Sequence, residues 1–207
     1  MKLFKVITIT AMTALVALRL GAAEGKPSIL TMEKVRSDLA NLSMLVGSSG
    51  AALQKVKDSA KSSSELNSAL KDFSDKYAAV ESQADTVRIN VINMKARTKE
   101  YHEAWLKELD AMKNPKLKEK ASSRFEDVKK EFTKIIEAGD KAKHEFVPYV
   151  TDLKDIKVYL DADSTPDAVN TLSNTIWKLG NQSKSVSAAI QNVVEQIDRT
   201  LSKSPSK

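Results

Sequence analysis

Hydrophobic residues recur every three or four positions through four long stretches of the chain, which is the spacing of one face of an α-helix. No stretch keeps the strict alternation of a half-buried strand. The clearest stretch alternates steps of four and three through Leu66, Leu70, Phe73, Tyr77, Val80, Ala84, Val87, Val91, Met94, Thr98, Tyr101 and Trp105. The pattern predicts an all-α protein with helices at 31–61, 63–113, 116–160 and 166–202.

Residues typical of helix ends separate these stretches. Ser62 followed three residues later by Glu65 has the spacing of a capping box, which predicts the start of the second helix. Thr165 before Pro166 predicts the start of the fourth helix, because Thr is a good N-cap and Pro fits the first helical position.

The predicted helix lengths indicate the shape of the molecule. At 1.5 Å per residue the second helix is about 75 Å long and the third about 65 Å. Short connections make sequence neighbours antiparallel, so we expect an elongated antiparallel four-helix bundle or coiled coil. The first and fourth helices are shorter than the central pair. The turn at Asn114-Pro115 should therefore project as a two-helix hairpin, roughly Lys95–Ala121.

The segment Met1–Ala23 has the pattern of a secretory signal peptide. Lys2 and Lys5 precede an uncharged, mostly apolar run of 13 residues, Val6–Leu18, and small residues follow as far as Ala23. This order of a basic, an apolar and a small-residue region predicts export and cleavage after Ala23.

A membrane anchor is the alternative interpretation of this segment. The apolar run is shorter than the roughly 20 residues of a membrane span, and Arg19 closes it. We therefore expect an exported protein, periplasmic or extracellular. Its parts would be a linker at 24–30, a single helical domain at 31–203 and a disordered tail at 204–207.

The charge of the chain is uneven. The formal net charge is +6, and three of the excess positive charges belong to the predicted signal. Between residues 95 and 130 there are 11 basic and 7 acidic residues. Lysines crowd the turn of the predicted hairpin: Lys113, Lys116, Lys118 and Lys120. Two interpretations remain open, a basic tip that contacts anionic lipid or an acidic partner, and an ordinary solvated turn.

Two further groups of residues are candidates for contacts. Tyr101 and Trp105 lie one helical turn apart near the hairpin turn. They either fill the space between two helices or form part of a contact site near the tip. Ser43, Gly47 and Ala51 repeat every four residues, which permits close helix approach, either within the monomer or in self-association.

Candidate chemistry is sparse. The chain has no Cys and two His, which excludes thiol catalysis and Cys-ligated metal sites. Glu137, Asp140 and His144 share a helical face and could touch a divalent cation, but we favour the interpretation that they form an ordinary solvated face. Phosphate-binding loops, nucleophile elbows and paired metal-ligand motifs are absent from the sequence. We predict no catalytic, cofactor-binding or metal-binding residues, no enzyme activity, no small-molecule substrate and no nucleic-acid partner.

Three stretches carry a family resemblance: Tyr101–Leu109 (YHEAWLKEL), Phe146–Asp152 (FVPYVTD) and Leu153–Asp161 (LKDIKVYLD). Together they resemble the bacterial family catalogued as domain of unknown function 2959, over about Ser63–Ser202. The resemblance implies an exported, long-helix fold and supplies no activity. Many members of that family carry a lipoprotein-type Cys after the signal, which this chain lacks.

These observations lead to two functional hypotheses. The first is an exported, non-enzymatic helical-bundle protein that acts as an interaction or structural module of the bacterial cell envelope, with a protein partner or a second copy. The second is a peripheral membrane protein that binds an anionic membrane surface through the basic hairpin tip around Pro115.

Overall fold

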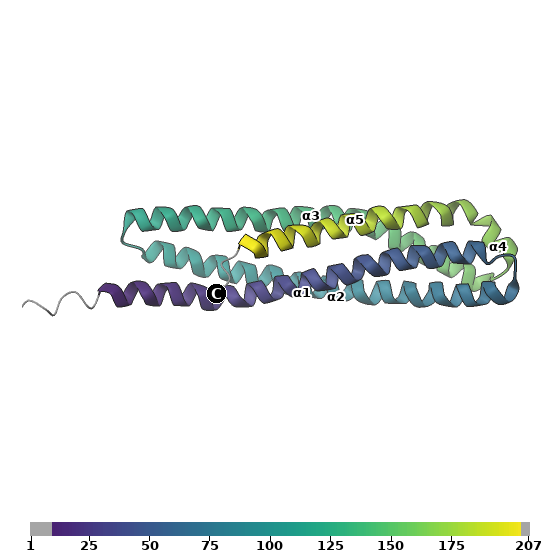
Figure 1. The fold of residues 1–207 in the computed structure, drawn as a ribbon, viewed down its shortest axis with the longest axis horizontal. Coiled ribbons are helices and arrows are strands. Elements are labelled where there is room, and N and C mark those ends of the chain that lie inside the picture. The colour runs from purple at the N-terminus through teal and green to yellow at the C-terminus, as the bar shows by residue number, and fades with distance from the viewer. Residues whose placement is uncertain (1–9, 204–207) are drawn as a thin grey trace, which may run out of the picture.

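The structure, a computed structural model, describes the backbone of residues 10–203 and the side chains of residues 29–202. Over this range the protein is all-α, as predicted. It contains four long helices and one short one: α1 (Thr10–Asp58), α2 (Ser63–Ala111), α3 (Pro115–Ala162), α4 (Pro166–Thr171) and α5 (Ser173–Lys203). The long helices pack antiparallel along one axis (Figure 1).

Helix α1 has the most extensive contacts in the bundle, because it packs along both α2 and α5, while α3 packs mainly along α5. The α2–α3 turn lies at one end of the long axis, and the α1–α2 turn and α4 lie at the other (Figure 1). Helix α5 ends well before the α2–α3 turn. One hydrophobic core runs along the axis and receives side chains from all four long helices.

Helix α1 begins earlier than the sequence pattern predicts. It starts at Thr10 and includes the 24–30 stretch that we expected to be a linker. Residues 11–23 are rich in Ala and Leu, which favour a helix, whereas Gly25 and Pro27 in the 24–30 stretch disfavour one, so helix propensity does not explain why α1 continues through that stretch. Of the predicted signal, residues 1–9 and all the side chains lie outside the described residues, as does the predicted tail at 204–207.

The fourth predicted helix, 166–202, is divided into α4 and α5 at Leu172. The N–H of Leu172 donates to two carbonyl oxygens, those of Ala168 at 3.3 Å and Val169 at 3.1 Å. The hydroxyl of Ser173 donates to the carbonyl oxygen of Asn170 at 2.7 Å. The polar side chains of this segment compete for the backbone bonds of a regular helix, which the hydrophobic spacing does not reveal.

The predicted caps have different outcomes. The Thr165 hydroxyl accepts from the N–H of Ala168 at 3.3 Å, which confirms the cap of α4. Ser62 is the N-cap residue of α2, so the predicted helix start is confirmed, but its side chain makes no capping bond and the capping box is absent. Backbone bonds hold this turn instead, since Ser62 N–H donates to Ser59 at 3.2 Å and the Ser62 carbonyl accepts from Leu66 at 2.9 Å.

Two glycines allow α1 and α5 to approach closely. A Cβ added to Gly50 would overlap the side chain of Ser183, with its Cβ only 2.6 Å away. On the other helix, a Cβ added to Gly180 would overlap the side-chain amide of Gln54. That amide donates to the carbonyl oxygen of Ile176 at 2.8 Å, so the space at Gly180 holds a bond between the two helices.

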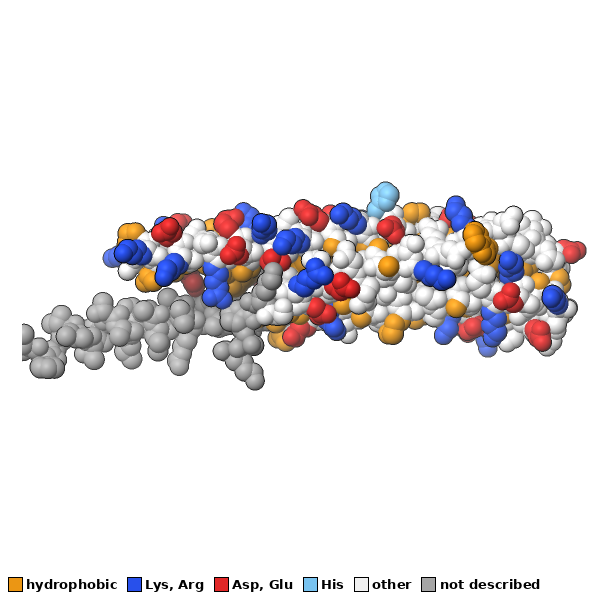
Figure 2. Space-filling model, turned by 45° about the horizontal axis from the view of Figure 1, so that its top comes forward, with side chains coloured by type: hydrophobic (Ala, Val, Ile, Leu, Met, Phe, Trp, Pro, Cys, Tyr) orange, Lys and Arg blue, Asp and Glu red, His pale blue; other side chains and the backbone are white. Residues whose placement is uncertain are grey.

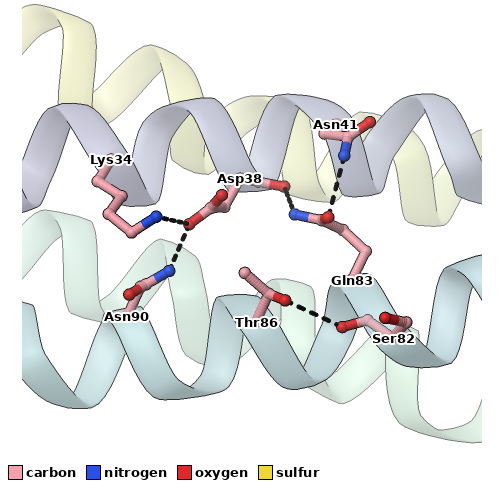
Figure 3. Close-up of polar contacts among 7 residues, drawn as sticks. All are labelled: Lys34, Asp38, Asn41, Ser82, Gln83, Thr86 and Asn90. Atoms are coloured by element: carbon pink, nitrogen blue, oxygen red, sulfur yellow. Dashed lines mark hydrogen bonds and ion pairs between the residues drawn. The ribbon is translucent and has the colours of Figure 1, made fainter.

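Polar side chains join α1 to α2 (Figure 3). The Asp38 carboxylate accepts from Asn90 at 2.7 Å and lies 3.9 Å from the Lys34 ammonium. The Asp38 carbonyl oxygen accepts from Gln83 Nε2 at 3.0 Å, and Gln83 Oε1 accepts from Asn41 at 3.0 Å. A shift of one turn between the helices would unpair these groups, so the network favours one register.

Among the helices that the structure describes, no segment is both long and apolar enough to cross a membrane.

Gly50→Ala should destabilise the protein although Ala favours the helix. The added methyl overpacks the α1–α5 contact, and overpacking costs about 1–3 kcal/mol. Gly139→Ala is the matched control, because an added Cβ there meets no atom within 4 Å. That variant should gain about 0.5–1 kcal/mol. The free energies of unfolding from urea titrations test both, and equal effects of the same sign would contradict the close contact.

Asn90→Ala should lower the free energy of unfolding by about 1–2 kcal/mol, because it removes a charge-assisted hydrogen bond to Asp38. Thr86→Ala is the control on the same helix, since the Thr86 hydroxyl donates to the carbonyl oxygen of Ser82, which also belongs to α2. Its effect should stay within about 0.5 kcal/mol. Similar losses in the two variants would show that the interhelical network contributes nothing specific.

Candidate functional site

The predicted lysines lie around the α2–α3 turn. Lys113, Lys116 and Lys120 are exposed. Lys118 is partly covered, and its ammonium lies 3.6 Å from the Asp110 carboxylate. The Asn114 side chain caps α3 by accepting from two backbone N–H groups, so the turn that carries these lysines is fixed at its base.

Two exposed leucines accompany the lysines, and the sequence analysis did not identify them. Leu106 on α2 is 47% exposed and Leu117 on α3 is 58% exposed. Figure 2 shows hydrophobic and basic side chains intermixed at this end of the molecule. We call this surface the hairpin tip and define it by Leu106, Leu117, Lys113, Lys116, Lys118 and Lys120. The missed signal is that Leu117 lies outside the apolar stripe and between two lysines.

An aromatic cluster lies below the hairpin tip. Tyr101 and Trp105 on α2 are in edge contact, with ring centroids 5.4 Å apart. Trp105 also contacts Phe125 of α3 edge-on at 5.5 Å. The two predicted aromatic residues therefore pack between the helices, yet both remain partly exposed. Burial raises the pKa of the Tyr101 phenol, while the nearby Arg124 lowers it.

A histidine completes this cluster. The ring of His102 contacts Phe125 edge-on at 5.4 Å and Phe132 at 6.2 Å. Burial lowers the pKa of His102, and the charge of Lys129 lowers it further. The sequence pattern did not predict this packing role of His102.

The small-residue stripe of α1 has two environments. The Ser43 hydroxyl donates to the Ser187 carbonyl oxygen at 3.1 Å, and the Ser187 hydroxyl donates back to the Ser43 carbonyl oxygen at 3.0 Å. Gly47 lies beside the same Ser187 hydroxyl, 3.8 Å from where its Cβ would be. Ala51 is exposed. The first two positions contact α5 within the monomer, and self-association through this face stays a prediction.

The candidate cation ligands do not converge. Glu137, Asp140 and His144 are all exposed on α3. In the part of the chain with described side chains, no group of three His, Asp or Glu residues is arranged to hold a metal ion.

Comparison with known proteins gives one match. The model of the family described as Protein of unknown function (DUF2959) matches residues 35–204. The comparisons with curated proteins and with solved structures return no match. The matched region contains the hairpin tip, the aromatic cluster and most of the α1–α5 contact. The chain therefore belongs to the DUF2959 family, as its sequence motifs predicted.

Proposed function

We propose that the chain is an exported, non-enzymatic helical-bundle protein that serves as an interaction or structural module of the bacterial cell envelope. Export rests on the signal-like segment Met1–Ala23. The absence of catalytic motifs from the sequence supports a role without chemistry. Family membership adds no activity, because the family itself is described as one of unknown function.

The observation that carries this proposal is the exposure of Leu106 and Leu117 on a tip that is otherwise rich in lysine. Large apolar side chains that are exposed to water raise the free energy of the protein, and a partner that covers them removes this cost. In the cleaved chain, Lys95–Ala121 would extend beyond the other helices as a two-helix hairpin. The early end of α5 supports this arrangement (Figure 1).

The second candidate function is peripheral binding to an anionic membrane. The same tip favours it, because lysines near an anionic bilayer contribute about 1 kcal/mol each and leucines can enter the interface. Lys118 should contribute least, since Asp110 already neutralises part of its charge. A protein partner with an acidic groove would use the same residues, so the two candidates need a direct test.

Export predicts a mature protein that begins at Glu24. Expression of the full chain in a bacterium, followed by fractionation and intact mass measurement, should detect this form outside the cytoplasm. Ala23→Leu should block cleavage, because the residue before the cut must be small. Ala22→Leu should be cleaved normally, because the second residue before the cleavage site does not have to be small. An uncut chain retained in the cytoplasm would reject the export proposal.

Membrane binding predicts that the mature chain floats with vesicles containing phosphatidylglycerol and not with pure phosphatidylcholine. Gln in place of Lys113, Lys116, Lys118 and Lys120 should weaken this binding about tenfold or more. The matched control replaces four exposed lysines away from the turn by Gln: Lys141, Lys143, Lys154 and Lys178.

Leu117→Ser should also weaken flotation, whereas Val158→Ser, an equally exposed apolar residue far from the tip, should not. Equal losses in the tip and control variants would indicate non-specific charge attraction and reject a membrane site at the tip. No flotation with either lipid would reject the membrane candidate and leave a protein partner for this surface.

A further inference from the structure

The α2–α3 contact below the hairpin tip contains two buried polar atoms without a hydrogen-bond partner among the described residues. They are Thr98 Oγ1 and His102 Nε2, which lie one helical turn apart on α2. Thr98 is only 4% exposed. Buried polar groups are nearly always paired, and an unpaired one costs about the desolvation of that group. Their presence in an aromatic contact calls for a physical reason.

The protonation state of His102 decides how well it fits this site. The neutral imidazole packs as an aromatic ring, edge-on against Phe125 and Phe132. When a histidine is protonated, both of its nitrogens are donors. Nε2–H would then point into a region with no acceptor among the described residues. Because the His102 side chain is only partly exposed, its positive charge would also lose part of its hydration.

Taken together, burial and the charged groups around His102 lower its pKa. Burial is the largest influence and lowers the pKa of His102. On α3, Lys129 lowers it further and Glu126 raises it, with the smallest effect of the three. On α2, the Tyr101 ring lies 6.1 Å away and carries no charge near neutral pH. His102 is therefore neutral at pH 7 and gains a proton only in more acidic solution.

The α2–α3 pair has little other contact to hold it. These two helices touch less than α1 touches α2 or α5, and α5 ends before the α2–α3 turn (Figure 1). A positive charge on His102 therefore destabilises the packing of α2 against α3 in a region where few other contacts hold the two helices together. We propose that His102 and its phenylalanine neighbours form a proton-sensitive clasp, which holds the α2–α3 hairpin closed at neutral pH and releases it on acidification.

Proton binding at His102 and opening of the α2–α3 hairpin are thermodynamically linked. An opened hairpin returns His102 to water, where its pKa has the ordinary value of 6.5. The opened state then binds the proton more tightly than the closed state. The clasp is at full strength above pH 6.5 and weakens as the pH falls through and below that value. This regulation does not depend on which partner the tip binds.

The chain is well suited to a direct test, because it has two histidines and no cysteine. Imidazole signals followed by NMR from pH 8 to pH 5 should show His102 titrating below the ordinary histidine pKa of 6.5. Nitroxide labels on Lys107→Cys and Ser122→Cys, which flank the turn on exposed positions, should report a longer and broader distance at pH 5 than at pH 8.

Two variants make the outcome decisive. His102→Gln and His102→Phe should each abolish the pH dependence of the label distance, while His144→Gln should leave it unchanged. Circular dichroism would establish that each variant keeps its helices. The proposal is overturned if His102 titrates at or above pH 6.5, if the label distance is constant over the titration, or if the His102 variants retain the full pH response.

Discussion

The close contact between α1 and α5 is the constraint on which the rest of the bundle depends. Gly50 leaves room for Ser183, and Gly180 leaves room for the amide of Gln54. With the two backbones this close, the fully buried Tyr149 of α3 reaches across to form a 3.0 Å hydrogen bond with Ser49 of α1. Three helices are thereby fixed in one axial register, and α2 joins them through its polar network with α1.

The sequence predicted the helices well because burial of one face repeats over many turns, and errors at single positions average out. The Asn114-Pro115 turn was equally clear, since Pro cannot continue the preceding helix. Details that rest on one or two bonds were not predictable. The division at Leu172 and the missing side-chain cap at Ser62 depend on local hydrogen bonds that compete with one another, and the hydrophobic pattern contains no information about them.

The candidate functional residues also fall into those that the sequence predicted and those that it did not. The sequence located the lysines of the tip and the neighbouring pair of Tyr101 and Trp105, because both follow from composition and helical spacing. It did not reveal the role of His102, which lies beside the apolar stripe and not on it. Successive helical residues are about 100° apart, so two neighbours can flank the same seam. Which of them meets α3 is set by the packing of Phe125 and Phe132.

The two ends of the bundle differ in how well they tolerate a buried polar or charged group that has no hydrogen-bond partner. At the end with α4, the core is enclosed by four helices, and a buried charge there would be opposed by the whole structure. Beyond the end of α5, the helices α2 and α3 make fewer contacts with the rest of the bundle. Separation of these two helices there therefore costs less free energy than unfolding of the whole protein. Thr98 and His102 lie in the C-terminal part of α2, which ends at Ala111 before the α2–α3 turn. A titratable group there can change the shape of the hairpin while the α1–α5 contact keeps the fold intact.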